Sequence, residues 1–279
     1  MRGTIADVSS RSRTMPGGKI LLMRYRTFAA AALVLALAAG PALAHFQELI
    51  PSNNIVEKET QKSVNLRAVF THPMEGGPIM NMGTPTQFGV IGREAQRSDL
   101  KSTLQSLPVG GKAAFSVDYN FRGPANYIFF LEPAPYWEPE EKKMLIHYTK
   151  TVVNAYGADD GWDEMVGFPI EIRPLTRPFG LWTGNTFSGI VMYDGKPSPF
   201  TRIEIEYKSD GKIKAPSDPY VTAVIKSDAN GYFSYAMPKA GWWGFAALQT
   251  GVRKMANPSG ETVPVEEGGL IWVRTIDMR

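Results

Sequence analysis

After residue 44 the chain alternates short β-forming runs with turn-forming residues, and this rhythm constrains its fold more than any other feature. Runs rich in β-branched and aromatic residues cover 63–70, 86–92, 113–121, 125–133 and 143–157. Clusters of glycine, proline and asparagine separate the runs, which is typical of strands joined by turns. The best helix candidate, 93–107, is polar and short, so we expect only a turn or two of helix there. The sequence therefore predicts an all-β fold.

We predict two β-sandwich-like domains, residues 45–173 and 178–279. Prolines in the stretch 170–182 mark the expected passage between them. In TRIEIEY (201–207), isoleucine and tyrosine alternate with charged residues, as in a half-buried strand. DANG (228–231) separates two β-forming runs and predicts a hairpin turn. We expect the second domain to be a small sandwich of the transthyretin-like or carboxypeptidase-regulatory-like kind.

Residues 23–44 have the order of a secretory signal peptide. Arg24 and Arg26 precede an apolar run, and the segment ends in Gly-Pro-Ala-Leu-Ala. The apolar run is shorter than the roughly 20 residues that a membrane-spanning helix needs. We therefore predict cleavage after Ala44 and a periplasmic mature protein with no membrane span. Met23 is then the expected start, and residues 1–22 are a mis-assigned N-terminal extension.

The net positive charge of the chain belongs to its targeting segment. Six of the 30 basic residues and one of the 27 acidic residues precede residue 45, which leaves 24 basic and 26 acidic residues in the mature chain. A mature protein with this balance gives no reason to expect nucleic acid or an anionic membrane surface as a partner. The chain has no cysteine, which excludes a disulfide framework and a thiolate metal site.

Cleavage after Ala44 would make His45 the first residue of the mature protein. Its terminal amine and ring Nδ1 could then bind one metal ion and close a six-membered chelate ring. The amine has a pKa of roughly 7.7–8.0 and the imidazole a pKa of about 6.5, so deprotonation costs little at neutral pH. One more imidazole nitrogen would complete a tetragonal three-nitrogen set, which suits Cu(II) or Ni(II).

The chain has three histidines, His45, His72 and His147, all within the first predicted domain. A buried imidazole often does no more than satisfy a hydrogen bond, so a single histidine is weak evidence for a metal site. The new N-terminal position of His45 is what favours a ligand role. We predict that His72 and His147 complete the ligand set and that the second domain is not needed to bind the ion.

The loop HPMEGGPIMNM (72–82) places further donors beside His72. We predict Glu75 as an axial or outer oxygen ligand. Met74, Met80 and Met82 are either weak thioether donors or side chains that fill gaps in the core, and the sequence leaves both interpretations open.

Four segments carry a resemblance to a known family: AHFQELIPS, FTHPMEGGPIMNMGTPTQFGV, IHYTKTVVNAYGADDGWDEMVGFPIEIRPLTRPFGLWTGN and YAMPKAGWWGFAAL. They resemble the periplasmic component of bacterial nickel/cobalt uptake transporters of the energy-coupling-factor type, a family catalogued as a domain of unknown function. The resemblance covers nearly all of 44–278. It implies extracytoplasmic binding of Ni(II) or Co(II) and association with a membrane permease, and it points by position to His45 and the THPMEGG loop.

The leading hypothesis is therefore a periplasmic protein that captures Ni(II) or Co(II) for import. One rival is a copper protein with an N-terminal histidine, either an oxygenase or a carrier, because nitrogen ligands alone favour Cu(II) over Ni(II). Another is a metal-free structural module of the cell envelope. The sequence contains no nucleophile–base motif, phosphate loop or dinucleotide fingerprint, so we expect a binding protein and not an enzyme.

Aromatic residues are dense in the second predicted domain: Trp182, Tyr232, Phe233, Tyr235, Trp242, Trp243 and Trp272. We expect some of them to pack against the first domain or to dock the permease, since aromatic anchors are favoured at protein interfaces.

Overall fold

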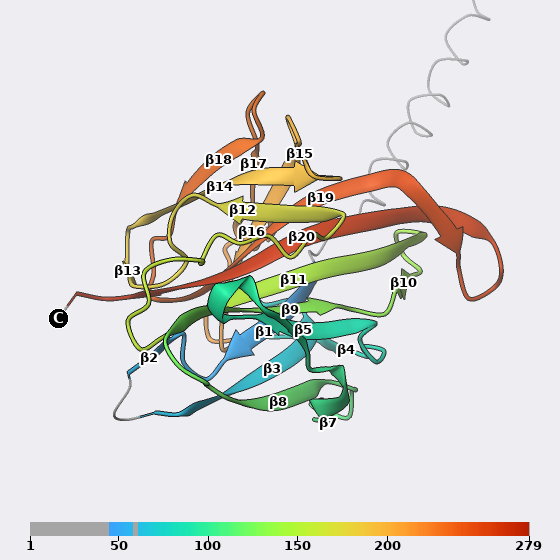
Figure 1. The fold of residues 1–279 in the computed structure, drawn as a ribbon. Helices are drawn as coiled ribbons and strands as arrows, with labels where there is room; N and C mark the ends of the chain where they lie inside the picture. The colour runs from blue at the N-terminus through green and yellow to red at the C-terminus, as the bar shows by residue number, and fades with distance from the viewer. Residues whose placement is uncertain (1–44, 58–60, 279) are drawn as a thin grey trace, which may run out of the picture. The chain divides into compact units, whose positions relative to one another are not determined.

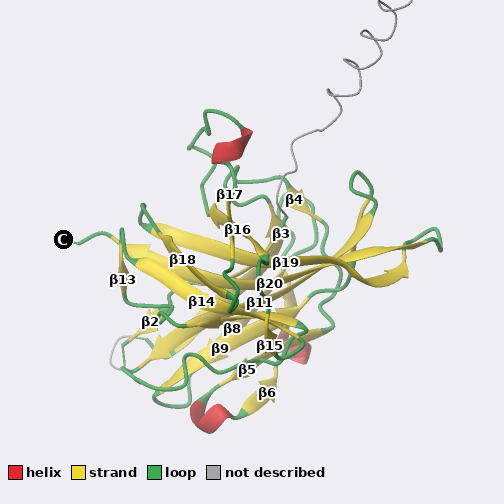
Figure 2. Cartoon of the chain, turned by 90° about the horizontal axis from the view of Figure 1, so that it is seen from above, coloured by secondary structure: helices red, strands yellow, loops and turns green. Residues whose placement is uncertain are grey.

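The computed structural model describes residues 45–57 and 61–278. The predicted extension and signal peptide, 1–44, lie outside the described residues. Within the described chain, strands joined by turns dominate, which confirms the all-β prediction (Figure 2). Helical structure there is limited to the short 3₁₀ turns η1 (Arg93–Ala95), η2 (Lys101–Thr103) and η3 (Asp218–Tyr220). Two of these lie in the stretch 93–107, as expected.

The strands form three sheets (Figure 1). A five-stranded sheet contains β1 (Phe46–Pro51), β3 (Ser63–Thr71), β8 (Phe115–Asn120) and β7 (Gln105–Ser106) in that order, with β4 (Ile79–Met80) beside β3. An eleven-stranded sheet runs β17 (Ala223–Lys226), β16 (Arg202–Tyr207), β19 (Gly241–Ala256), β20 (Thr262–Ile276), β11 (Lys143–Ala155), β9 (Ala125–Glu132), β5 (Gln87–Ile91) and β6 (Arg97–Asp99). Its branches are β10 (Tyr136–Glu138), β2 (Ile55–Val56) and β13 (Leu181–Trp182). A four-stranded sheet contains β12 (Ile170–Pro174), β14 (Thr186–Tyr193), β15 (Lys196–Pro197) and β18 (Tyr232–Ala236).

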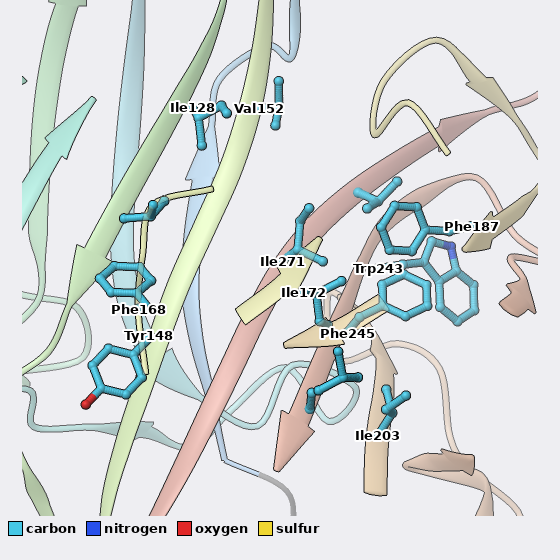
Figure 3. Close-up of a cluster of buried hydrophobic side chains, with 14 of the residues drawn as sticks. Ile128, Tyr148, Val152, Phe168, Ile172, Phe187, Ile203, Trp243, Phe245 and Ile271 are labelled. Atoms are coloured by element: carbon cyan, nitrogen blue, oxygen red, sulfur yellow. The ribbon is translucent and has the colours of Figure 1, made fainter. Parts of the chain in front are cut away.

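The eleven-stranded sheet lies between two hydrophobic cores. The first core, formed with the five-stranded sheet, includes Leu49, Leu66, Phe88, Val117, Phe129, Leu145 and Val153. The second core, formed with the four-stranded sheet, includes Ile128, Tyr148, Val152, Ile172, Phe187, Ile203, Phe245 and Ile271 (Figure 3). Successive side chains of a strand point to opposite faces, and β11 accordingly sends Leu145 and Val153 to the first core and Tyr148 and Val152 to the second.

The two predicted sandwiches are therefore joined through one shared sheet. Strand β11 of the first pairs in parallel with β20 of the second, from Met144 opposite Val265 to Thr151 opposite Trp272. Strand β12, which lies before the expected boundary, pairs with β14, which lies after it. Residues 45–57 and 61–278 consequently belong to a single compact unit, and parallel strands of this kind are buried on both faces.

Two local expectations in the second half meet different outcomes. In β16, Ile203 and Ile205 are buried as the alternation predicts, but Glu206 is buried as well. DANG does form a tight turn, with Gly231 at a φ of 78°. The hairpin prediction is wrong, however, because β17 pairs with β16 and β18 pairs with β14, so the turn carries the chain from one sheet to another.

The aromatic residues of the second half mostly build the interior. Trp243 and Phe233 lie in the second core, whereas Trp182 and Tyr232 are exposed. Trp272 is fully buried against Phe46 of β1, with ring centroids 6.0 Å apart, and its Nε1 donates a hydrogen bond to the carbonyl oxygen of Gln47 at 3.0 Å. This contact fixes the start of β1 on the large sheet.

Candidate functional site

His45 and His72 meet because of the register between the first two long strands. Strands β1 and β3 are antiparallel, with Phe46 opposite Thr71. His45 comes directly before Phe46 and His72 directly after Thr71, so the two histidines continue the same register. Their ring centroids lie 4.6 Å apart. An imidazole at a strand end and another beside a glycine-rich loop thus become neighbours through backbone pairing alone.

His147 is the third imidazole of the cluster and projects from β11. The ring of Phe70 lies between it and the other two: its centroid is 5.7 Å from that of His45 and 6.0 Å from that of His147. Gly268 on β20 makes room for the His147 ring, since a Cβ at that position would lie 2.7 Å from Cδ2 of His147. The glycine pair in the sequence EEGGL therefore allows β20 to pass close to the site.

Several nitrogen atoms of this cluster are buried without a hydrogen bond. Within residues 45–57 and 61–278, no partner is found for Nδ1 of His72 or for Nδ1 and Nε2 of His147. His147 is only 2% exposed and His72 only 5%. A buried polar atom without a partner costs about 1–3 kcal/mol, so each of these atoms is a place where a ligand would restore a lost interaction.

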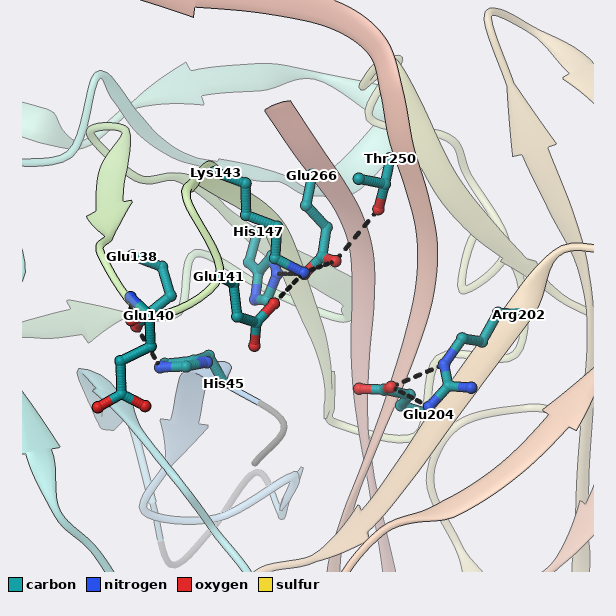
Figure 4. A network of polar contacts seen from close by, with 10 residues as sticks. All are labelled: His45, Glu138, Glu140, Glu141, Lys143, His147, Arg202, Glu204, Thr250 and Glu266. Atoms are coloured by element: carbon teal, nitrogen blue, oxygen red, sulfur yellow. Dashed lines mark hydrogen bonds and ion pairs between the residues drawn. The ribbon is translucent and has the colours of Figure 1, made fainter. Parts of the chain in front are cut away.

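Two carboxylates, Glu138 of β10 and Glu266 of β20, face the histidines (Figure 4). Oε2 of Glu138 lies 3.0 Å from Nε2 of His45, and Oε1 of Glu266 lies 3.6 Å from Nε2 of His147. Lys143 forms ion pairs with both Glu141 and Glu266, the latter at 2.5 Å. The site is thus an imidazole cluster bordered by acids, with one lysine engaged by two of them.

The electrostatics of the site keep His45 and His72 neutral at pH 7. Burial, followed by the influence of His147, lowers the pKa of His45 to about 4. Burial, followed by the influence of His45, lowers the pKa of His72 to about 4. Burial would raise the pKa of Glu266, but the neighbouring His147 and Lys143 together lower it to about 2. A divalent cation binds the neutral form of an imidazole, so His45 and His72 are in the protonation state that metal binding requires.

The loop after β3 is held by residues from the second half of the chain. The carbonyl oxygen of Pro73 accepts a hydrogen bond from the N–H of Ser209 at 2.9 Å. Oε2 of Glu206 accepts one from the N–H of Met74 at 3.1 Å. The backbones of Gly76 and Gly211 touch so closely that a Cβ on Gly76 would lie 2.7 Å from the nitrogen of Gly211. His72 therefore begins a loop that is held in place by backbone contacts with the second half of the chain.

The remaining candidates of this loop differ in their surroundings. Glu75 is exposed, and its charge raises the pKa of His72 only against the larger effect of burial. Met82 is buried in the first core, with its sulfur 3.9 Å from Nε2 of Gln47, and Met80 packs against the same core. Met74 is half-buried. For Met80 and Met82 the structure thus supports the packing interpretation.

As the side chains stand, no three histidine, aspartate or glutamate residues of the described chain converge closely enough to hold one ion. His45 and His72 are the close pair, while His147 faces Glu266. A terminal amine on His45 would be a further donor, and the Ala44–His45 bond lies at the edge of the described residues. The preformed part of the candidate site is accordingly the pair His45–His72.

Sequence reasoning missed three residues of the site: Glu138, Lys143 and Glu266. It also placed the whole site in residues 45–173, whereas the histidines and the start of β1 have neighbours on β20 as well. Glu266 and Trp272 both belong to β20, and they contact His147 and the start of β1 respectively. The EEGGL segment offered one signal, because adjacent glycines inside a β-forming run often mark a close approach.

The chain belongs to the family described as Domain of unknown function (DUF4198), whose model matches residues 42–251. This agrees with the part of the predicted resemblance that concerned a domain of unknown function. A search of curated proteins found no match. No helix of residues 45–57 or 61–278 is long and apolar enough to cross a membrane.

Three solved structures are distantly similar to this chain. The D0–D1 domain of intimin is 10% identical, with 83% of this chain and 100% of that chain covered and a TM-score of 0.25. The Yersinia pseudotuberculosis adhesin InvE is 12% identical, with 80% and 58% covered and a TM-score of 0.20. BcpA*(D312A), the major pilin subunit of Bacillus cereus, is 8% identical, with 80% and 65% covered and a TM-score of 0.18. We draw no functional inference from similarities of this size.

Proposed function

We propose that the mature protein binds a divalent transition-metal ion, Ni(II) or Co(II), through His45 and His72, and passes it to a membrane permease for import. The observation that carries the proposal is the 4.6 Å separation of the His45 and His72 rings, together with the unpartnered Nδ1 of His72 among the described atoms. These are two of only three histidines in the chain, and a long-range strand pairing brings them together.

With a free amine at His45, the pair supplies three nitrogen donors: the amine, Nδ1 of His45 and a ring nitrogen of His72. His147 would supply a fourth after its ring turns from Glu266. Glu75 remains a possible outer oxygen donor, since its loop begins at His72. The ion is the cargo of such a protein and not a resident cofactor, so moderate affinity with a route for release suits the role better than a closed cage.

The choice of nickel or cobalt over copper follows the resemblance of the sequence, and periplasmic location follows the predicted signal peptide. Three nitrogen donors without a thiolate bind Cu(II) more tightly than Ni(II) when both are available. A copper protein is therefore the second candidate. As a carrier, the Ni(II) or Co(II) protein should catalyse no reaction, whereas reductant-dependent peroxide production by copper-loaded protein would favour the oxygenase alternative.

The decisive experiment compares two proteins that differ by one residue at the N-terminus. One begins at His45 and the other carries a single alanine before it, which converts the amine into an amide nitrogen and removes a donor. Titration with Ni(II) should show tight one-to-one binding by the first protein and far weaker binding by the second, with identical circular dichroism. Equal affinity of the two proteins would disprove the chelate. Intact-mass measurement of the exported protein tests the cleavage after Ala44 separately.

A further inference from the structure

We propose that Glu138 is a positioning residue that fixes the His45 ring so that Nδ1, and not Nε2, is presented to the metal ion. This inference rests on the proposed function, because it concerns the ring nitrogen that would share a chelate with the terminal amine. Nothing in the sequence pattern singles out Glu138, which lies in the short strand β10.

The carboxylate of Glu138 is itself held in place. It is only 7% exposed. Its Oε1 accepts a hydrogen bond from the N–H of Glu140 at 3.0 Å, and its Oε2 lies 3.0 Å from Nε2 of His45. Lys143, which is opposite Glu138 in the β10–β11 pair, extends instead to Glu141 and Glu266. One oxygen of Glu138 is thus fixed by its own turn, and the other faces His45.

This contact selects one tautomer of the neutral ring. A neutral imidazole has one protonated nitrogen and one with a free lone pair, and a carboxylate can only accept a hydrogen bond. A carboxylate oxygen 3.0 Å from Nε2 therefore favours the tautomer with its proton on Nε2, which leaves the lone pair on Nδ1. Nδ1 is also the nitrogen nearer the backbone and the one that closes a six-membered ring with the terminal amine. Carboxylates that hold the far nitrogen of a ligand histidine act in this way in many metal sites.

The other two histidines also have Nδ1 without a hydrogen bond. Nε2 of His147 faces Oε1 of Glu266 at 3.6 Å, and Nδ1 of His147 has no partner in the described part of the chain. Nδ1 of His72 is likewise buried and unpartnered there. Nδ1 is therefore free of a hydrogen bond in His72 and His147, and at His45 a single, well-fixed carboxylate lies beside the opposite nitrogen.

The test begins with metal-free protein, so that it does not depend on binding. Mature protein starting at His45 is labelled with ¹⁵N-histidine, and the tautomers are read from long-range ¹H–¹⁵N spectra at neutral pH. We expect His45 to be protonated at Nε2 in the wild type and to become a mixture of tautomers in Glu138→Ala. Glu138→Gln keeps only one acceptor oxygen, which the N–H of Glu140 engages, so its NH₂ group faces Nε2 of His45 and should move the ring proton to Nδ1. Glu140→Ala removes an exposed acid two residues away and is the matched control.

Titration with Ni(II) gives the second measurement. Glu138→Ala should bind about 10–100-fold more weakly than the wild type, the usual cost of losing a carboxylate that orients a ligand. Glu138→Gln should also bind more weakly, whereas Glu140→Ala should stay close to the wild type. The proposal is overturned if either the tautomer or the affinity of Glu138→Ala matches that of Glu140→Ala. Absence of Ni(II) binding by the wild type would refute the proposed function instead, and the spectra would still decide whether Glu138 sets the tautomer.

Discussion

The Lys150–Glu171 pair and the histidine cluster are both polar groups buried inside the β fold, but their surroundings differ. Nζ of Lys150 lies 2.5 Å from Oε1 of Glu171, and the two residues are 1% and 2% exposed. Glu171 also accepts hydrogen bonds from the N–H groups of Val166, Gly167 and Phe168. Both carboxylate oxygens therefore have donors, and the pair ties the 166–168 segment to β11.

The histidines are buried to a similar degree with far fewer partners. Nδ1 of His72 and both nitrogens of His147 lack hydrogen bonds to any residue that the structure describes. Both carboxylate oxygens of Glu171 have donors, whereas three nitrogens of the imidazoles have no hydrogen bond in the described chain. Oγ1 of Thr151 is also buried without a partner, so the comparison teaches that unsatisfied buried groups indicate a ligand site only where metal-binding side chains gather around them.

The largest effect should come from breaking the Lys150–Glu171 pair. Lys150→Ala leaves Glu171 charged and buried without its cation, and such a change costs about 3–5 kcal/mol of unfolding free energy. We expect urea unfolding to show this loss, while the molecules that remain folded bind Ni(II) with unchanged affinity. Lys212→Ala is the matched control, because it breaks the exposed Lys212–Asp210 pair and should not move the midpoint. A loss of affinity in folded Lys150→Ala protein would contradict the division of roles.

At the histidine cluster we expect the opposite result, a loss of Ni(II) affinity with little change in stability. His72→Leu replaces an imidazole with an apolar side chain and removes the orphaned Nδ1. Its Ni(II) affinity should fall by more than the roughly 10–100-fold that loss of an orienting partner causes. Its metal-free stability should stay within about 1 kcal/mol of the wild type, because removing an unpaired polar atom offsets the lost packing. Titration and urea unfolding of the same preparation check both. If the His72→Leu variant is strongly destabilised but binds Ni(II) with unchanged affinity, His72 has a structural role and is not a ligand.

The two lowered histidine pKa values predict how the stability of metal-free protein depends on pH. His45 and His72 titrate at about 4 in the folded chain and at about 6.5 when unfolded. Between these values the unfolded chain binds protons that the folded chain does not, so the free energy of unfolding falls as pH drops from about 6.5 toward 4. Urea unfolding across this range should show the decline, and His72→Leu should make it shallower. An identical slope in the variant would mean that other groups dominate.

The smallest effect should come from Met82, which the structure places in the first core. Met82→Leu keeps an apolar side chain of similar volume, and such exchanges usually cost less than about 1.5 kcal/mol. We expect a small change in stability and no change in Ni(II) affinity. A clear loss of affinity would show that the Met82 sulfur is a ligand. The metal site would then include a residue of the first core.

The sequence was sufficient to predict the strands and to single out the three histidines as candidate ligands, because both are local signals. Short β-branched runs between turn residues predict strands directly, and His45 stood out through the predicted cleavage site. The register that places His45 beside His72 was not predictable, since it depends on antiparallel pairing between β1 and β3. Periodicity tells which residues of a strand share a face but not which strand lies opposite.

Glu138 and Glu266 escaped prediction for the same physical reason. Glu266 reaches His147 through the pairing of β11 with β20. Glu138 lies on β10, which pairs with β11, and it meets His45 only because the chain start before β1 lies beside this hairpin. The hairpin expected at DANG failed similarly, because the turn residues specify a reversal and not the sheet that receives the next strand. The boundary near residue 173 was expected from prolines, which mark loops, but loops need not separate cores.

The parallel pairing of β11 with β20 also has a consequence for the order in which the protein can be made. Synthesis proceeds from the N-terminus, so β11 emerges long before its neighbour β20, which ends at Ile276. Until then one edge of an apolar strand has no partner, and such edges invite pairing with other chains. Contacts between residues this distant in sequence also form slowly. A chain cut short before β20 would lose the strand beside His147 and with it Glu266, so the last segment to arrive completes the neighbourhood of a site whose first residue is His45.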